Sequence, residues 1–531
     1  MASAAAAPEI WNADRSAAGR VNPWLIVAII SLPTFMEVLD TSVANVSLNN
    51  IAGGLSVTTD QATWVLTSYL VANAVIIPIS GWLSDAIGRK RYFLISIALF
   101  TVASFLCGIA PNLETLIVAR IFQGIGGGGL APIEQSILAD TFPPKQRGMA
   151  FAAFAIVIVV GPVLGPTIGG WITDAASWHW IFLVNVPVGV IAFLLAQAFV
   201  DEPAAVKADR AAKIKGGLRI DYVGVILVFL GLGFLELTLD RGEREDWFAS
   251  SSIIATATIA AVSLVALIIW EFDHDDPVVD VKLLKTRNFR ITLLTMFMTG
   301  MILFGTTQLI PQMLQQVLGY SALNAGLALT TAGLATLVMV PVVGRLTGMV
   351  DVRWLIFIGL MAQAYAMWHM TGLSGDISFA DASTARLYQA AALPFLFIPI
   401  NTAAYVGLPR NKTAQASSLL NVARNLGGSL GISMAQTLLS TYQQVHQSRI
   451  VETLNPSNPN YNEWLAQAQQ LAPGDATTPL ALMYQTMQRQ VAMLAFLDVF
   501  RTLMVVIIVV APVVFLMRPT KGGGGSEGMG H

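Results

Sequence analysis

Fourteen apolar runs of membrane-crossing length divide this sequence. A helix of about 20 residues spans the hydrocarbon layer of a bilayer, which is about 30 Å thick. Runs of this kind occupy residues 24–48, 61–82, 92–110, 113–139, 149–172, 180–200, 221–239, 252–271, 291–313, 322–347, 353–372, 384–405, 415–440 and 495–517. Only 12% of the residues are charged, against about 25% in soluble domains. The sequence therefore predicts an all-α membrane protein with fourteen transmembrane helices.

Lysine and arginine residues are concentrated in alternate loops. Residues 89–91, 145–147, 207–219 and 282–290 contain 14 of the 30, and the opposite loops contain few. Short cytoplasmic loops are enriched in these cations. An even number of spans puts both termini on one side, so both are predicted to be cytoplasmic. The first residues lack the short apolar core and cleavage site of a signal peptide, so none is expected.

The spacing of the runs predicts six helices, two inserted helices and six more helices. The expected segments are a cytoplasmic tail (1–22), a six-helix bundle (23–200), a basic linker (201–220), two inserted helices (221–272), a second linker (273–290), a second six-helix bundle (291–517) and a glycine-rich tail (518–531). Residues 441–490 interrupt the second bundle as a long external segment. Its Asn and Pro residues disfavour continuous helix, although residues 479–490 could extend the last helix outward.

Charged side chains inside predicted spans are candidates for function because they are costly there. Glu37 and Asp40 lie three residues apart and so share one face of the first helix. Arg120 in the fourth span lies at about the same depth as Asp40, roughly 12 Å below the external surface at 1.5 Å per residue. We expect Asp40, Glu37 and Arg120 to couple proton movement to transport. The alternative is a static ion pair that fixes the two helices.

Arg424 is the other deep cation, and Asn421 and Asn425 flank it. Together with Glu37, these three residues are predicted to line a substrate cavity. Arg424 could equally neutralise a carboxylate across that cavity. Glu134 lies near the predicted cytoplasmic edge, where we expect its carboxylate to be solvated.

A short basic loop follows the second span. It contains Gly81, Asp85, Gly88 and Arg89, and it ends at Arg91. The glycines allow close approach of neighbouring backbone, and the carboxylate can accept hydrogen bonds from a helix N-terminus. The loop could also be an ordinary cytoplasmic loop selected only for its positive charge.

The fifth span combines regularly spaced glycines with prolines. Glycines at intervals of four residues create a groove for a neighbouring helix, and prolines bend a helix. This pattern predicts a helix that packs tightly and yet changes its angle. The residues are Gly161, Pro162, Gly165, Pro166 and Gly169.

Other motifs carry no separate chemistry. The glycine run 124–129 lies inside an apolar helix and follows no strand, so it is interpreted as helix packing and not as a nucleotide site. The five histidines have no ligand spacing, and Cys107 is the only cysteine. We expect no cofactor, no metal site, no nucleic-acid binding and no enzymatic activity.

Several motifs together resemble the fourteen-helix drug:proton antiporters of the major facilitator superfamily, in their EmrB-type branch. These are Leu39–Val46, residues 81–91, Arg120 to Gly124, residues 161–170, Trp180 to Pro187, Leu239–Gly242 with Asp246–Phe248, Pro277–Asp280 with Arg287–Phe289, and Asn455–Asn460. The similarity covers residues 22 to 517. It implies two six-helix bundles plus two additional helices, with Asp40, Arg120 and the glycine motif in coupling and gating.

The resemblance also implies a function: proton-driven export of hydrophobic or amphipathic toxic compounds across a bacterial inner membrane. It further implies a periplasmic adaptor and an outer-membrane channel as partners, with residues 441–490 as the candidate docking surface. The loop 81–91 is expected to hold the cytoplasmic side closed through Asp85 and a helix terminus of the other bundle. An uptake permease of the same fold, or a receptor that transports nothing, are the alternatives. The sequence names no particular substrate.

Overall fold

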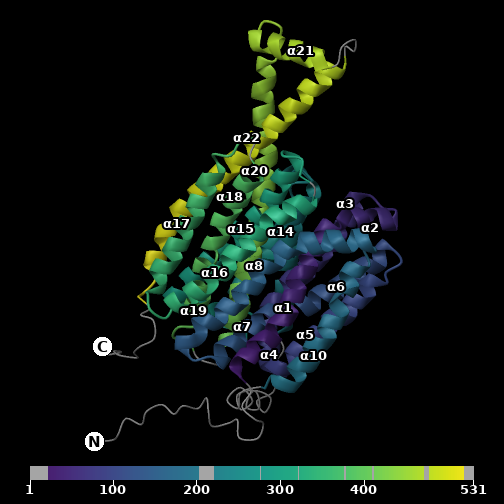
Figure 1. Cartoon of the computed structure of the whole chain (residues 1–531). Coiled ribbons are helices and arrows are strands. Elements are labelled where there is room, and N and C mark those ends of the chain that lie inside the picture. Colours follow the sequence, from purple (N-terminus) through teal and green to yellow (C-terminus); the bar gives the residue numbers. More distant parts are fainter. Residues whose placement is uncertain are drawn as a thin grey trace, which may run out of the picture.

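The computed structural model describes residues 22–201, 221–274, 277–320, 322–375, 378–408, 412–471 and 477–519. These residues form helices and contain no strand (Figure 1). The first half contains α1 (Pro23–Val46), α2 (Leu48–Leu55), α3 (Thr59–Ala62), α4 (Trp64–Ile87), α5 (Arg89–Gly108), α6 (Leu113–Gly127), α7 (Leu130–Thr141), α8 (Pro144–Ala175), α9 (Trp180–Leu183) and α10 (Asn185–Phe199).

The inserted segment and the second half follow. The inserted segment contains α12 (Tyr222–Val228), η1 (Phe229–Gly233), α13 (Phe234–Arg241), η2 (Trp247–Ala249) and α14 (Ser251–Asp273). The second half contains η3 (Val281–Lys285), α15 (Arg287–Gln316), α16 (Ala322–Leu346), α17 (Val352–Met370), α18 (Phe379–Ala392), α19 (Pro394–Ala404), α20 (Thr413–Thr453), α21 (Pro459–Leu471), α22 (Thr478–Val510) and η5 (Ala511–Leu516).

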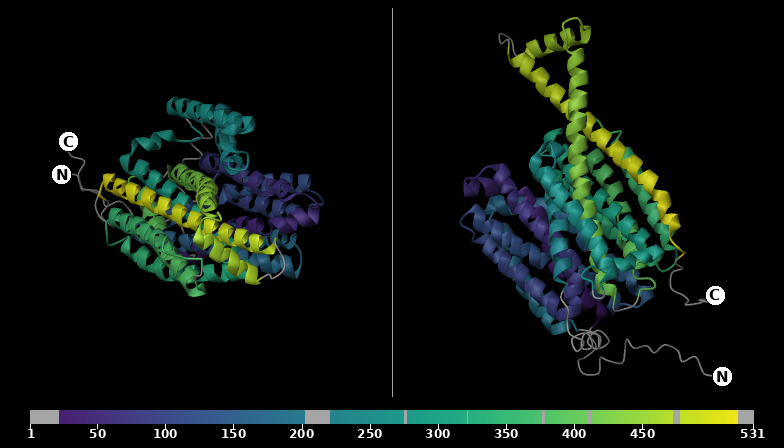
Figure 2. Two further views of the ribbon diagram at one scale, coloured as in Figure 1. Left: turned by 90° about the horizontal axis from the view of Figure 1, so that it is seen from above. Right: turned by 180° about the vertical axis from the view of Figure 1, so that it is seen from behind.

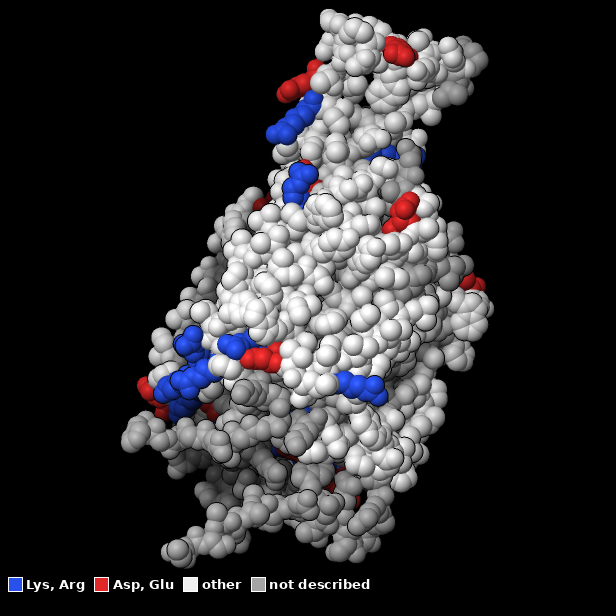
Figure 3. All heavy atoms as spheres, turned by 60° about the vertical axis from the view of Figure 1, so that its left-hand side comes forward, with Lys and Arg blue, Asp and Glu red and all other residues white. Residues whose placement is uncertain are grey.

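The helices have the length and polarity of membrane spans. Among the described residues, ten helical segments are long and apolar enough to cross a bilayer. The helices α8, α16, α17 and α20 pack alongside them in the same bundle. Figure 3 shows a broad band free of Lys, Arg, Asp and Glu on one face, with charged residues beyond both of its edges. The protein is thus an all-helical membrane protein, and the count of fourteen spans stays a prediction.

The two halves meet mainly along α8 and α4 of the first half, and α7 also packs on α20 and α8 on α19. Helix α8 of the first half packs on α16 of the second, and α4 packs on α20. Within the second half, α15 and α20 are in backbone contact, because a Cβ atom on Gly431 would lie 2.7 Å from the Cα atom of Met301. The inserted helices lie at one side of both bundles when the molecule is seen from above (Figure 2).

Residues 441–490 do not form one continuous helix, and residues 479–490 belong to the last long helix, α22. Helix α20 continues to Thr453, α21 follows from Pro459, and α22 begins at Thr478. The three helices form a projection that stands away from the bundle, at the end opposite the α4–α5 connection (Figures 1 and 2). Asn and Pro residues do occur where α20 stops, at Asn455 and Pro456, so they end a helix here and do not prevent one.

Candidate functional site

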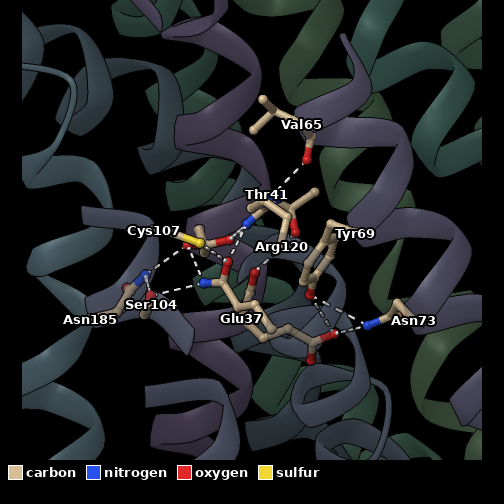
Figure 4. A network of polar contacts seen from close by, with 11 residues as sticks. Glu37, Thr41, Val65, Tyr69, Asn73, Ser104, Cys107, Arg120 and Asn185 are labelled. Atoms are coloured by element: carbon tan, nitrogen blue, oxygen red, sulfur yellow. Dashed lines mark hydrogen bonds and ion pairs between the residues drawn. The ribbon is translucent and has the colours of Figure 1, made fainter. Parts of the chain in front are cut away.

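The predicted pair of Asp40 and Arg120 forms a buried ion pair. Arg120 Nη1 lies 2.6 Å from Asp40 Oδ2, and both side chains are fully buried. The guanidinium also donates from Nε to the carbonyl oxygen of Val65 at 3.0 Å and lies over the ring of Tyr69. Helices α1 and α6 supply the two charges, and α4 supplies the carbonyl and the ring (Figure 4). The pair therefore ties three helices of the first half together.

Three uncharged polar residues complete this network, and neither charge nor depth in the sequence points to them. Gln123 and Asn185 each donate to Asp40 Oδ1, at 2.9 and 2.7 Å. Both amides also donate to the Ser104 hydroxyl. Gln123 lies one turn beyond Arg120 on the same helix face, a spacing that could have identified it. Asn185 and Ser104 come from two other helices, so only the tertiary structure brings them to Asp40.

Glu37 lies on the same helix as Asp40 but in a different environment. Asn73 Nδ2 donates to Glu37 Oε1 at 3.0 Å, and the Tyr69 hydroxyl donates to the same oxygen at 3.3 Å (Figure 4). No ion pair to Glu37 occurs among the described residues. A proton could therefore add to Glu37 without breaking a salt bridge, whereas protonation of Asp40 would disrupt an ion pair.

Arg424 lies on α20 and acts electrostatically on two carboxyl groups of the first half. These are Glu37 and Glu134. The expectation that Glu134 is a solvated edge residue is wrong: it is completely buried, and its Oε1 accepts a hydrogen bond from Ser31 at 2.6 Å. Helix α7 directs the Glu134 side chain into the protein, whereas its position along the predicted span suggested contact with water. Glu134, which is buried, and Glu37, which is half-buried, thus interact electrostatically with one buried arginine across the junction between the halves.

Asn421 and Asn425 also reach across this junction. Asn421 Nδ2 donates to Gln135 Oε1 at 2.8 Å, and Asn425 Nδ2 donates to Asn73 Oδ1 at 3.2 Å. Asn73 is the residue that donates to Glu37. The amides of α20 are therefore linked to the carboxyl group of α1 by one intervening side chain.

The glycine motif of α8 faces the helix that carries both carboxyl groups. A Cβ atom on Gly161 would overlap Val38, one on Gly165 would overlap Ser42, and one on Gly169 would overlap Val43. The groove predicted for this helix is therefore filled by α1. The side chains of Pro162 and Pro166 lie outside those that the structure describes.

The loop 81–91 contacts the beginning of α20. Arg89 forms an ion pair with Asp140 and donates from Nη2 to the Thr413 hydroxyl at 3.0 Å. A Cβ atom on Gly81 would lie 3.0 Å from the Cα atom of Gln415. Gly88, at the junction of α4 and α5, has a φ of +103°, a conformation that favours glycine. The loop therefore touches a helix terminus of the other half at the end of the bundle where α1 begins.

Within the described residues, no group of three or more His, Cys, Asp or Glu side chains could hold a metal ion. The buried polar groups instead form hydrogen-bonded networks that contain carboxyl groups and arginines. Such a core can hold and release protons as the helices around it shift. Fold and site together define a polytopic membrane transporter.

Comparisons with known proteins agree with this class. A family model described as Major Facilitator Superfamily matches residues 30–432. The chain is 41% identical over 462 residues to the multidrug export protein EmrB of Haemophilus influenzae, covering 87% of this chain and 89% of that protein. It is 36% identical to EmrB of Escherichia coli, covering 96% of this chain and 98% of that protein. It is also 36% identical to the fatty acid resistance protein FarB of Neisseria gonorrhoeae, covering 96% of this chain and 98% of that protein.

Solved structures show the same fold. The proton:xylose symporter XylE matches with a TM-score of 0.58 at 14% identity, over 94% of this chain and 97% of that one. The human organic anion transporter MFSD10 matches with a TM-score of 0.54 at 13% identity, over 92% of this chain and 100% of that one. The chain belongs to the major facilitator superfamily, in the group of EmrB-type proteins. It is a multi-pass protein of the bacterial inner membrane.

The two carboxyl groups of α1 are predicted to respond differently to neutralisation. Asp40→Asn leaves the guanidinium of Arg120 buried without its counter-charge, a loss of about 3–5 kcal/mol of folding stability. Glu37→Gln removes no ion pair and keeps an acceptor for Asn73, so stability should change little. Thermal unfolding of the purified protein in detergent measures both. Equal losses for the two variants would show that the ion pair does not hold the bundle together.

Proposed function

We propose that this protein exports hydrophobic or amphipathic toxic compounds and that inward proton flow drives the export. The names of its relatives, which include multidrug export and fatty acid resistance proteins, support export of such compounds. The observation that carries proton coupling is Glu37, a carboxyl group that lies between the halves without an ion pair. A carboxyl group in that position can change its charge when the halves rearrange.

The charges around the junction suggest how the coupling works. Glu37 belongs to the first half, and Arg424, which acts on it, belongs to the second. A proton on Glu37 removes the attraction between the two groups and so favours separation of the halves at this level. Loss of the proton restores the attraction. Asp40 and Arg120 lie within one half and act as a fixed support for this exchange.

The two halves rock against each other around this centre, in the manner of alternating access. In the present structure the contacts of Arg89 and Gly81 with α20 hold one end of the junction together. That end is the predicted cytoplasmic one. The loop 81–91 is therefore a latch that must open before a compound enters from the cytoplasm, and Asp85 is assigned to it by its place in the motif.

The projection formed by α20, α21 and α22 is the proposed docking surface for a periplasmic adaptor. Its residues are largely exposed between Thr441 and Leu471. Two contacts brace its base, where His446 lies 2.8 Å from Asp498 and the Tyr442 hydroxyl lies 3.1 Å from Thr502. An adaptor bound here would connect the transporter to an outer-membrane channel.

Transport by the purified protein in liposomes is expected to depend on a pH gradient. A lipophilic cationic dye and a lipophilic weak acid should each move against their gradients when protons flow inward. Movement should stop when an ionophore collapses the gradient. Glu37→Gln should abolish gradient-driven transport, because this residue can no longer change its charge. Fluorescence of the two compounds follows the transport.

Export that continues at the same rate without the gradient would exclude proton coupling. No flux of any compound would favour a receptor that does not transport, and accumulation of a single nutrient would favour an uptake permease. If Glu37→Gln keeps full gradient-driven transport of each compound, another group carries the proton.

Opening of the latch is expected to be sensitive to its charged residues. Asp85→Asn and Arg89→Ala should lower the transport rate at least a few-fold, because the closed cytoplasmic end loses its contacts. Membrane insertion and yield should be unchanged. Radiolabelled substrate flux and immunoblots of membranes measure the two effects. Wild-type rates in both variants would remove the latch from the mechanism.

The adaptor is expected to need the projection and not the bundle. Replacement of residues 449–482 by a short Gly-Ser linker removes the tip and keeps the contacts of His446 and Tyr442 at the base. This variant should retain transport in liposomes and lose copurification with the adaptor. Normal recovery of the complex would place adaptor binding elsewhere.

A further inference from the structure

Helix α13 of the inserted segment contacts both halves through acidic side chains. The helix packs on α4 of the first half and on α20 of the second. Glu236 and Asp240 lie one turn apart on it and so share a face. Asp240 accepts a hydrogen bond from Thr67 of α4, and Glu236 Oε1 accepts one from the Ser429 hydroxyl of α20 at 2.6 Å. One short helix outside the two bundles therefore bridges the two halves.

Glu236 is buried and only half satisfied. Its side chain is 3% exposed, and its Oε2 has no hydrogen-bond partner among the described residues. The Ser429 contact uses only the other oxygen. A buried carboxylate with one unpartnered oxygen and no cation is costly in a membrane protein, and such groups mark sites where protons or ions bind.

No cation on the packed elements compensates this carboxyl group. On its own helix, Arg241 pairs with Glu245 and lies over the Trp64 ring. Asp240 is the described group whose charge acts on Glu236, and it is also negative. The remaining titratable or charged groups of the packed helices make no described contact with Glu236. They are Tyr69 and Asp85 on α4, Tyr222 on α12, Glu271 and Asp273 on α14, and Arg424, Tyr442, His446, Arg449 and Glu452 on α20.

Glu236 lies close to the external end of the bundle. Arg241 lies within 4.0 Å of Asp60, which immediately precedes the external end of α4. Five residues of helix separate Arg241 from Glu236, a rise of about 7.5 Å. The Ser252 hydroxyl donates a hydrogen bond to Glu245, which lowers the pKa of that carboxyl group. Arg244 and Asp246 beside it are exposed, so charged groups of this loop reach water. Glu236 therefore lies less than two helical turns from the external loop.

We propose that Glu236 is a second proton-binding site of the transporter, at the junction between the inserted helix and the two halves. The inference rests on proton-driven export and adds a site to it. A proton from the external side adds to the free oxygen, Oε2, and the carboxylate becomes a neutral carboxylic acid. The same proton leaves from this oxygen when the site releases it.

Ser429 gives this site a connection to the central one. Its hydroxyl has a single hydrogen, which can reach Glu236 Oε1 or, at 3.2 Å, the carbonyl oxygen of Asn425. With the proton on Oε2, Glu236 is neutral and its Oε1 becomes a weaker acceptor, so the Ser429 hydrogen turns more readily to the Asn425 carbonyl oxygen. Asn425 follows Arg424 and donates to Asn73, the partner of Glu37. Protonation of Glu236 therefore changes hydrogen bonding on the helix that carries Arg424.

The test counts protons per exported molecule. Purified protein in liposomes is given a lipophilic cationic dye, and the pH gradient at which net dye flux is zero is measured for wild type, Glu236→Gln, Ser429→Ala and Asp240→Asn. Glu236→Gln should lower the number of protons per dye molecule by one and flatten the pH dependence of transport. The other two variants should keep the wild-type ratio. Glutamine keeps the size of the side chain and an acceptor for Ser429.

The variants separate a proton site from a structural contact. If Glu236 only held α13 to α20, Glu236→Gln would behave as wild type and Ser429→Ala would be impaired. That pattern would overturn the proposal. An unchanged number of protons per dye molecule in Glu236→Gln would also overturn it. Should Glu236→Gln fail to fold, Glu236→Asp keeps a titratable group and is expected to keep the ratio, with a shifted pH profile. A reduced ratio in Glu236→Asp also overturns it. Wild-type transport that ignores the gradient would instead refute the proposed function itself.

Discussion

The buried ion pair between Asp40 and Arg120 is the interaction on which the first half depends. Two full charges without solvent are tolerated only when other groups also satisfy them. Gln123 and Asn185 fill that role on one oxygen of Asp40, and the Val65 carbonyl does so for Arg120. Five helices, α1, α4, α5, α6 and α10, are joined through this network, so buried polar contacts as well as apolar packing hold the first half together.

The charges between the halves are arranged in a different way. Glu37 and Glu134 have hydrogen bonds to neutral groups, and Arg424 acts on both from the opposite half without an ion pair among the described residues. A charge centre shared by two bodies can strengthen or weaken as they separate, whereas a centre inside one body cannot. The same reasoning applies to Glu236, whose hydrogen-bond partner lies on α20 and whose neighbour Asp240 binds α4.

Close backbone packing determines which surfaces can move. Helix α8 accepts α1 along its glycines, and α15 meets α20 along Gly431. Contacts with no intervening side chains favour sliding or tilting over separation, because small shifts create no large cavity. The latch at Gly81 and Arg89 differs from these helix pairs, because it joins the two halves at one end of the bundle only. The helices are thus tightly packed within each half, and the halves are joined by helix packing of α8 on α16 and of α4 on α20 as well as by polar contacts.

The sequence alone determined the fold class, the family and the depth match between Asp40 and Arg120, because apolar length, alternating cations and helical rise depend on local order along the chain. It did not reveal Gln123, Asn185 and Ser104 around Asp40, since three further helices had to be brought together. Residue counting also placed Glu134 in water, whereas the turn between α6 and α7 directs it inward. In residues 441–490 the Asn and Pro residues indicated a helix break, but only the tertiary structure shows that α20 extends to Thr453 and that α21 packs on α22. Tertiary contacts decided these points because burial and partnership depend on neighbours distant in the chain.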